Sequence, residues 1–280
     1  MTIAITGATG HLGRLALAAL KARAPQADVV ALARDAQADL GVPVRAFDYT
    51  KSETLALALA GIKTLVLISS NDFNDRAGQH LAVINAARAA GVARIVYTSI
   101  LKGDTSPMIL AQDHIATEAA LKASSLAVTL LRNGWYTENY TGSLKASVEH
   151  GALIGSSGDG RIAAAARADY AEAIAVTALD DSTAGKTYEL AGDTPFTMAE
   201  FAAEVSKQVG KTIPYNSLPK DVYAGILQSF GLPAGFAAVL ADSDDTASRG
   251  ALLDESHTLS KMIGRPTTPI AVTIAAALAG

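Results

Sequence analysis

The sequence predicts an α/β fold, a doubly wound parallel sheet that is followed by a smaller C-terminal α/β portion. Two observations support this prediction. Short runs that are almost entirely apolar, such as Leu65–Ile68 and Ile95–Tyr97, alternate with longer amphipathic stretches. Strands that are covered by helices on both faces have this composition, because neither face meets water. The repeated strand–helix–strand order then implies right-handed parallel crossovers.

The elements of the predicted sheet follow in order along the first half of the chain. Strands are expected at Thr2–Thr6, Asp28–Ala33, Val44–Asp48, Thr64–Ser69, Arg94–Ser99 and Ala127–Arg132. Helices are expected between them at Leu12–Arg23, Ser52–Ala60, Arg76–Ala90 and Leu110–Ser124. Gly61 and Gly91 follow two of these helices, as left-handed C-terminal caps require. Because open α/β sheets host many functions, this pattern alone predicts no activity.

The chain changes character after about residue 133, where the regular alternation ends. Strands are expected at Ala152–Ile154, Thr187–Leu190 and Thr212–Tyr215, and helices at Asp169–Leu179, Met198–Val209, Val222–Phe230 and Pro233–Asp242. We therefore predict a sheet domain over residues 1–133 and a smaller substrate-binding portion over residues 134–280. Some elements, Asp169–Leu179 among them, are free to return to the first domain. The crevice at the carboxyl edge of the sheet is the default ligand site.

Composition excludes several classes of function. The chain has 280 residues and no cysteine, which excludes disulfides, a thiol nucleophile and Cys-ligated metals. Its net charge of −4 argues against a nucleic-acid partner. Mean hydropathy is +0.25, but no run of about 18 uncharged apolar residues predicts a membrane span, and the N-terminus lacks a signal-peptide pattern. The histidines are scattered, so no metal site is predicted, and Asp242–Asp245 is interpreted as a solvated acidic loop.

A glycine-rich turn follows the first strand and opens a helix. Its glycines have the spacing G-x-x-G-x-x-G, and the predicted cofactor-binding residues in it are Gly7, Ala8, Thr9, Gly10, His11, Leu12 and Gly13. In this context the first glycine suits a tight turn, the second a close approach of backbone to diphosphate, and the third helix–strand packing. The helix then presents N–H groups and a positive dipole end to phosphate. We therefore predict a Rossmann-type dinucleotide site; the alternative is a plain packing turn.

Arg34 predicts which nicotinamide cofactor binds. It ends the second strand, where NAD-binding sites usually carry an acidic residue for the ribose 2′-hydroxyl. A guanidinium instead accommodates a 2′-phosphate through planar, permanently charged donors. This favours NADPH over NADH. The alternatives are a solvated surface arginine and the use of NAD through the adjacent Asp35.

Other candidate cofactor ligands follow the third and fourth strands. Asp48 can accept from the adenine amino group, or it is a turn residue. Hydrogen bonds to ribose hydroxyls are predicted for Ser69, Ser70 and Asn71. Arg76 either covers the diphosphate or simply begins the next helix.

These residues resemble the NmrA-like branch of the atypical short-chain dehydrogenase/reductases, and within it most nearly the bacterial type 2 NAD(P)H:quinone oxidoreductases and the triphenylmethane reductases. The stretches that carry the resemblance are Ile5–Gly13, Tyr97–Ser99, Asp104–Pro107, Leu130–Tyr140, Tyr188–Asp193 and Ala241–Asp244. The resemblance implies NADP(H) along residues 7–13 with Arg34 on its 2′-phosphate, and quinone reduction beside the nicotinamide. It also implies that Asn133–Tyr140 contributes to cofactor and substrate binding, and we add Thr98, Ser99 and Asn139 to the expected cofactor ligands.

The expected catalytic helix departs from the pattern of alcohol dehydrogenases of this superfamily. Those enzymes carry Tyr-x-x-x-Lys, whereas His114 and Glu118 occupy the corresponding positions here. A quinone accepts hydride readily, so positioning can replace strong protonation. Our hypothesis is direct hydride transfer in a ternary complex. His114, with an ordinary pKa near working pH, would donate a hydrogen bond or proton to the oxyanion, or else it only packs.

Aromatic residues cluster in a chain that has few of them. Trp135, Tyr136 and Tyr140 are the predicted substrate-binding residues, since flat rings suit a planar quinone or dye, and Tyr140 is the second catalytic candidate. They are also the usual filling between subdomains. Asn139 can bond the nicotinamide amide or a substrate oxygen.

Two functions compete on this sequence. The first is a cytoplasmic NADPH-dependent reductase of quinones or similar planar acceptors. The second is an NADP(H)-binding redox sensor without turnover, which the missing Tyr-x-x-x-Lys pair would fit. The aromatic segment Trp135–Tyr140 favours the reductase. The apolar end, Ile270–Ala279, is interpreted as a docking helix and suggests a homo-oligomer.

Overall fold

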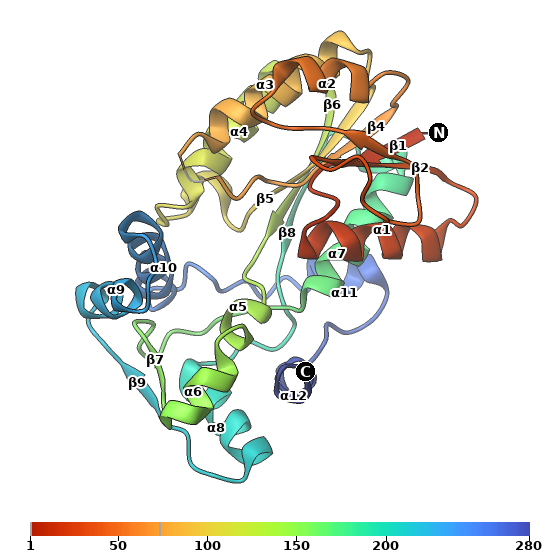
Figure 1. Cartoon of the computed structure of the whole chain (residues 1–280). Coiled ribbons are helices and arrows are strands. Elements are labelled where there is room, and N and C mark those ends of the chain that lie inside the picture. The colour runs from red at the N-terminus through yellow and green to blue at the C-terminus, as the bar shows by residue number, and fades with distance from the viewer. Residues whose placement is uncertain (1, 73) are drawn as a thin grey trace. The chain divides into compact units, whose positions relative to one another are not determined.

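The computed structural model describes residues 2–72 and 74–280, and the chain divides into two compact units, each described here by itself (Figure 1). Unit 1 comprises Met1–Gly103, Asp113–Asn133 and Arg167–Tyr188. Unit 2 comprises Asp104–Gln112, Gly134–Ala166 and Glu189–Gly280. Residue 133 thus ends one segment of unit 1, and the helix expected at Asp169–Leu179 belongs to that unit.

Unit 1 is built on a seven-stranded sheet in the order β3-β2-β1-β4-β5-β6-β8. Its strands are β1 (Thr2–Ile5), β2 (Asp28–Ala33), β3 (Val44–Ala46), β4 (Thr64–Leu67), β5 (Arg94–Ile100), β6 (Ala127–Asn133) and β8 (Thr187–Leu190), the last of which ends in unit 2. Strands β1 to β6 pair in parallel. Strand order reverses between β1 and β4, so the switch point lies at their carboxyl ends. The predicted doubly wound α/β fold is therefore confirmed.

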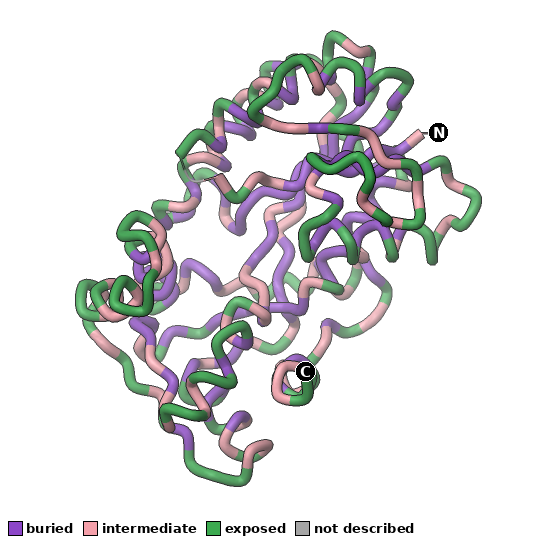
Figure 2. The backbone as a smooth tube through the Cα atoms, in the orientation of Figure 1, coloured by how far each residue is buried: buried purple, intermediate pink, exposed green. Residues whose placement is uncertain are grey.

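Helices of unit 1 cover both faces of this sheet. They are α1 (His11–Arg23), α2 (Ser52–Ala58), α3 (Arg76–Ala89), α4 (Ala111–Ala123, entering unit 1 at Asp113) and α7 (Arg167–Leu179), with the short 3₁₀ turn η2 (Asp181–Thr183). Every residue of β4 and β5 is buried, as their unbroken apolar runs predict (Figure 2). Alternate strand residues, including Leu65, Leu67 and Tyr97, form one core with side chains of α2 and α3. Helix α1 packs against α7.

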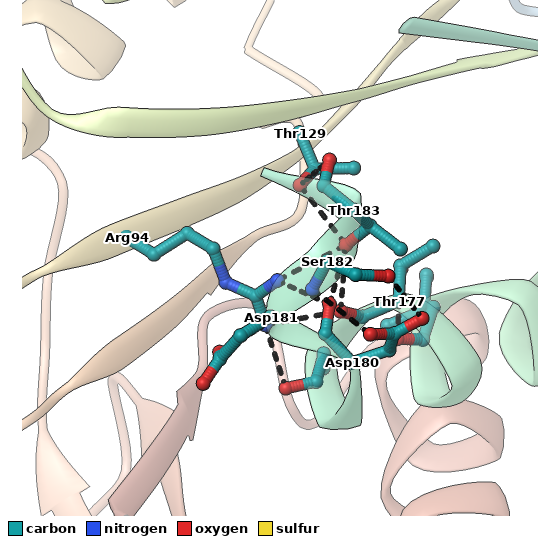
Figure 3. Close-up of polar contacts among 9 residues, drawn as sticks. Arg94, Thr129, Thr177, Asp180, Asp181, Ser182 and Thr183 are labelled. Atoms are coloured by element: carbon teal, nitrogen blue, oxygen red, sulfur yellow. Dashed lines mark hydrogen bonds and ion pairs between the residues drawn. The ribbon is translucent and has the colours of Figure 1, made fainter. Parts of the chain in front are cut away.

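Arg94, the first residue of β5, holds the carboxyl end of α7 (Figure 3). Its guanidinium donates to the carbonyl oxygens of Thr177 (3.0 Å), Ala178 (2.9 Å) and Asp180 (2.7 Å). Helix α7 carries no basic residue in its own last turn. A cation from the sheet therefore satisfies the orphan carbonyls and complements the helix dipole. This contact explains why a helix that follows residue 133 packs in unit 1.

Unit 2 is mostly helical. It contains β7 (Leu153–Gly155) and β9 (Tyr215–Ser217), which pair in parallel, and the helices α5 (Glu138–Thr141), α6 (Leu144–His150), α8 (Met198–Val209), α9 (Lys220–Ser229), α10 (Ala234–Ala247), α11 (Thr258–Ile263) and α12 (Ile270–Ala279). A 3₁₀ turn, η1 (Gly103–Thr105), leads into residues 104–112.

Two predictions for unit 2 are wrong. The strand expected at Thr212–Tyr215 forms later, at Tyr215–Ser217, because Pro214 lacks the N–H that a strand interior needs. The acidic run Asp242–Asp245 lies inside α10 instead of in a solvated loop. Asp242 and Asp244 are buried, and the Asp242 carboxylate bonds Lys220 Nζ and the Ile109 N–H, both at 2.8 Å. Hydrogen bonds and an ion pair with residues distant in sequence therefore stabilise a buried helical position for carboxylates whose sequence pattern is typical of a loop.

Candidate functional site

The glycine-rich turn lies at the switch point of the unit 1 sheet. Thr6 links the two strands there: its N–H donates to Val66 O at 3.0 Å, and its hydroxyl accepts the Ile68 N–H at 3.0 Å. Gly7 has φ +59°, in the left-handed region that glycine favours. A Cβ on Gly13 would lie 2.2 Å from Gly7 O, so helix and turn pack too closely for any side chain. The turn thus brings bare backbone to the edge of the sheet.

The N-terminus of α1 is arranged to receive an anion. Gly10 is its N-cap, no side chain in the described part of the chain caps it, and its first turn contains no acidic residue. A Cβ on Gly10 would stand 3.2 Å from Gly7 O, tighter than ordinary contact. The N–H groups of the first turn and the positive end of the helix dipole are therefore not satisfied by a side chain of the described residues. A diphosphate fits this arrangement.

Arg34 follows β2, the strand beside β1, and its side chain is exposed. The neighbouring Asp35 turns back on its own backbone, where its Oδ1 accepts the Gln37 N–H at 2.9 Å. The guanidinium therefore stands at the same strand edge as the glycine turn, and part of the Asp35 carboxylate is engaged locally. This geometry suits a 2′-phosphate better than a ribose hydroxyl.

Asp48 caps the turn that leads into α2. Its Oδ1 accepts the Thr50 N–H at 3.0 Å and the Thr50 hydroxyl at 2.8 Å. These bonds are the main cause of its lowered pKa; Lys51 and Arg34 lower the pKa further. Asp48 thus makes the bonds of a turn residue through Oδ1, and its role toward adenine stays a prediction.

Residues of α3 and β5 form hydrogen bonds with the loop after β4. Ser69 N–H donates to Thr98 Oγ1 (2.9 Å), and Ser70 N–H donates to His80 Nε2 (2.9 Å). Asn71 is exposed. Thr98, an expected cofactor ligand, therefore positions the backbone of another one, Ser69.

Arg76 begins α3, and its side chain is only 4% exposed. Its Nε donates to Ser70 O at 2.6 Å, and its Nη1 lies 3.6 Å from Asp113 Oδ2. The guanidinium thus points into unit 1 and bridges the loop to α4. It also lowers the pKa of both His80 and His114, after burial as the first cause.

His114 is buried on α4, 6% exposed, with its Nδ1 2.9 Å from the Tyr97 hydroxyl. Burial first, then the charges of Arg76 and His80, lower its pKa to about 3. The expectation of a histidine that titrates near working pH is therefore wrong, because desolvation opposes the imidazolium. A neutral imidazole still carries one N–H that can donate a hydrogen bond.

Glu118, one helical turn further along α4, is engaged by the sheet. Its carboxylate accepts from the Ser99 hydroxyl (2.7 Å) and from two nitrogens of Arg132 (2.9 and 2.7 Å). Gly103 makes room for that guanidinium, since a Cβ there would overlap Arg132 Cζ. The position that corresponds to the usual lysine is therefore structural, and the hydroxyl of Ser99 serves it.

The aromatic candidates belong to unit 2. Trp135 and Tyr136 are half-buried, and Asn139 is exposed. The ring of Tyr140 meets Phe196 edge-on at 6.3 Å, and its buried hydroxyl has no hydrogen-bond partner among the described residues. Burial first, then Asp244, raises the pKa of Tyr140 well above its ordinary value. Tyr140 is thus a partly buried ring whose hydroxyl resists ionisation, and its role in catalysis stays a prediction.

Three residues that the sequence analysis missed connect these side chains: Thr6, Tyr97 and His80. Tyr97 lies within the quoted Tyr97–Ser99 stretch, but its apolar neighbours suggest only a buried strand. Among residues 2–72 and 74–280 no three acidic or histidine side chains gather as a metal site would require. Within the same residues no helix is both long and apolar enough to cross a bilayer.

Comparison with known proteins gives a consistent result. The family model described as the NmrA-like family matches residues 1–261. The chain is 50% identical to Quinone oxidoreductase 2 of Escherichia coli over 97% of both chains. The crystal structure of the NADPH-dependent quinone oxidoreductase of E. coli complexed with NADPH has a TM-score of 0.94, with 49% identity and 99% coverage of each chain. The NADP(H) complex of Citrobacter sp. triphenylmethane reductase has a TM-score of 0.90, with 34% identity and coverage of 99% and 100%. The chain belongs to the NmrA-like family.

Proposed function

We propose that this protein is an NADPH-dependent reductase that transfers hydride to quinones or similar planar acceptors. The observation that carries the proposal is its 50% identity to Quinone oxidoreductase 2 of E. coli, which extends over 97% of both chains. A likeness to the structure of an NmrA mutant has 15% identity and supports the fold alone. The enzyme is therefore favoured over the redox sensor.

The residues present fit the cofactor. Gly7, Gly10 and Gly13 keep the turn beside an uncapped helix N-terminus free of side chains, and Arg34 supplies an exposed cation at the neighbouring strand end. Backbone N–H groups of residues 10–13 would hold the diphosphate and Arg34 the 2′-phosphate. Bound NADPH supplies the hydride.

His114 would bind the acceptor oxygen as a neutral donor. Hydride transfer turns a quinone into a hydroquinone monoanion, and a hydrogen bond to the oxygen strengthens as charge develops there. The charge of Arg76, which opposes protonation of His114, favours an anion beside it for the same electrostatic reason. The monoanion then takes its remaining proton from water, which completes the hydroquinone.

Trp135 and Tyr136 are the proposed contacts for the flat face of the acceptor, because both keep exposed surface. Asn139 keeps its proposed role at the nicotinamide amide. Tyr140 contributes by packing against Phe196. The proposal includes a cytoplasmic location, which a cysteine-free chain fits. It also includes a homo-oligomer that uses α12, which light scattering would test.

The test is NADPH oxidation, followed by the ultraviolet absorbance of the reduced nicotinamide, with and without benzoquinone. We expect oxidation that depends on the acceptor and saturates with it. Tight NADPH binding without acceptor-dependent oxidation, across a panel of quinones and triphenylmethane dyes, would contradict the proposal and favour the sensor.

A further inference from the structure

A chain of buried polar groups connects β5 with α3 and α4 inside unit 1. Tyr97 on β5 lies between the rings of His80 (5.5 Å between centroids) and His114 (6.0 Å). The Tyr97 hydroxyl is 2.9 Å from His114 Nδ1, and His80 Nδ1 is 2.9 Å from Thr117 Oγ1. All four residues are buried. The protons that these groups hold inside the protein need acceptors there; Nε2 of His114 is the exception, since it has no partner among the described residues and is not among the fully buried side-chain atoms.

The protons of His80 can be assigned from its two bonds. Its Nε2 accepts the Ser70 N–H at 2.9 Å, so this nitrogen carries no proton. Burial lowers the pKa of His80 to about 3, so the ring is neutral and its one proton is on Nδ1. That proton goes to Thr117 Oγ1. The Thr117 hydroxyl in turn donates to Asp113 O at 2.8 Å, one turn back in α4.

Thr117 has a single hydroxyl proton, which it donates to Asp113 O. Thr117 therefore donates no proton to the Tyr97 hydroxyl. Its partner is His114 Nδ1, and two arrangements are available. If Nδ1–H donated to Tyr97, the tyrosine proton could only turn to Thr117 Oγ1, which lies close enough to hold the pKa of Tyr97 down against burial but already accepts from His80 Nδ1. If Tyr97 donates to Nδ1, both groups are satisfied. The second arrangement leaves the single proton of the neutral His114 ring on Nε2.

We infer that Tyr97 is a positioning residue, whose hydroxyl donates to Nδ1 of His114 and so keeps Nε2–H as the donor to the acceptor oxygen. This inference rests on the proposed function, in which His114 binds that oxygen. No hydrogen bond from Nε2 to any described residue competes with it. The other tautomer would present a bare lone pair, which repels an oxygen that gains negative charge.

The charged and titratable groups around His114 support the same arrangement. Arg76 on α3 and His80 on α3 lower its pKa, and Tyr97 faces it from β5. Glu118 on its own helix is bound by Arg132 and Ser99. None of these groups supplies a carboxylate that would charge the imidazole. The Tyr97 hydroxyl, which fixes the tautomer, therefore determines the state of His114 at this site.

The test is the tautomer of His114, read from ¹H–¹⁵N correlations of the imidazole in the NADP⁺-saturated protein. We expect Nε2–H in the wild type. In Tyr97→Phe we expect the restriction to be lost, with Nδ1–H populated. Nδ1–H in the wild type, or undiminished Nε2–H in Tyr97→Phe, would overturn the inference. The wild-type measurement stands even if the variant does not fold.

A matched control is Tyr49→Phe, which removes a partly buried tyrosine hydroxyl that donates to Ile68 O at 2.9 Å and does not touch His114. Tyr97→Phe should lower kcat with benzoquinone about 10-fold at unchanged KM for NADPH, and Tyr49→Phe should not. In a His114→Ala background the added Tyr97→Phe should have no further effect. An equal effect in both backgrounds would contradict positioning through His114. Absence of any benzoquinone reduction in the wild type would contradict the proposed function instead, while the tautomer still tests the Tyr97–His114 bond.

Discussion

Arg132 and Glu118 form a partly buried two-point ion pair, with Nε–Oε1 at 2.9 Å and Nη2–Oε2 at 2.7 Å. The pair joins β6 to α4, the helix that carries His114. In a low-dielectric interior such a pair is expensive to break on one side only, because the remaining charge loses its partner. Glu118 therefore fixes the position of α4 on the sheet.

Glu118→Gln should destabilise the protein by about 3–5 kcal/mol, because it removes the carboxylate that binds two nitrogens of Arg132. Urea unfolding measures this free energy. Lys122→Met is the control: Lys122 lies 3.8 Å from the same carboxylate but is 63% exposed, so its loss should change stability by less than about 1 kcal/mol. Equal losses of stability in Glu118→Gln and Lys122→Met would contradict the structural role of the Arg132–Glu118 pair.

Arg34→Ala should weaken NADPH binding by about 10- to 100-fold and leave NADH binding nearly unchanged, because only NADPH carries the 2′-phosphate. Fluorescence titration with each reduced cofactor measures both constants. The control is Asp35→Asn, whose amide oxygen can still accept the Gln37 N–H. Equal losses for the two cofactors would mean that Arg34 does not touch the phosphate.

His114 should stay neutral across the working range of pH. Since its folded pKa is lowered to about 3, below the unfolded value of 6.5, the stability that it contributes is present above pH 6.5 and is lost as pH falls toward 3. On acidification from pH 7.5 to 4.5 the wild type should lose about 2 kcal/mol more than His114→Gln. Urea unfolding at the two pH values checks this, and an imidazole signal that titrates near pH 6.5 would refute it.

Asp244 should show the opposite pH dependence. Burial raises its pKa to about 6 from an ordinary value of 3.8, so its contribution to stability is full below pH 3.8 and is lost as pH rises through 6. Its Oδ2 accepts the Ser156 N–H at 3.1 Å, a bond that an asparagine oxygen can keep. Asp244→Asn should therefore gain about 2 kcal/mol over the wild type at pH 8 and little at pH 4. A gain of equal size at both pH values would exclude ionisation of Asp244 as its cause.

Much of the cofactor region could be predicted because its signals are local. The glycine turn is a matter of backbone conformation and close approach at Gly7 and Gly13, and both requirements are readable from residue type and spacing. The buried strands are readable for the same reason, since a strand covered on both faces can contain few polar residues. Misplaced elements such as Thr212–Tyr215 lie in unit 2, where short strands do not alternate regularly with helices.

The chemistry of His114 could not be read in this way, because its state depends on residues that are distant along the chain. Tyr97 and Arg76 come from other elements, and only folding buries the imidazole beside them. The same holds for Asp244 inside α10.

The amino-acid sequence determined the parallel α/β sheet, the dinucleotide turn and the candidate cation at Arg34. These features depend on residue type and on the spacing of residues that are close together in the chain. Tertiary packing alone decided which polar groups are charged and which pair with one another, as in Glu118 with Arg132. The physical reason is that the free energy of a charge depends on its desolvation and on partners that only the folded chain brings within reach.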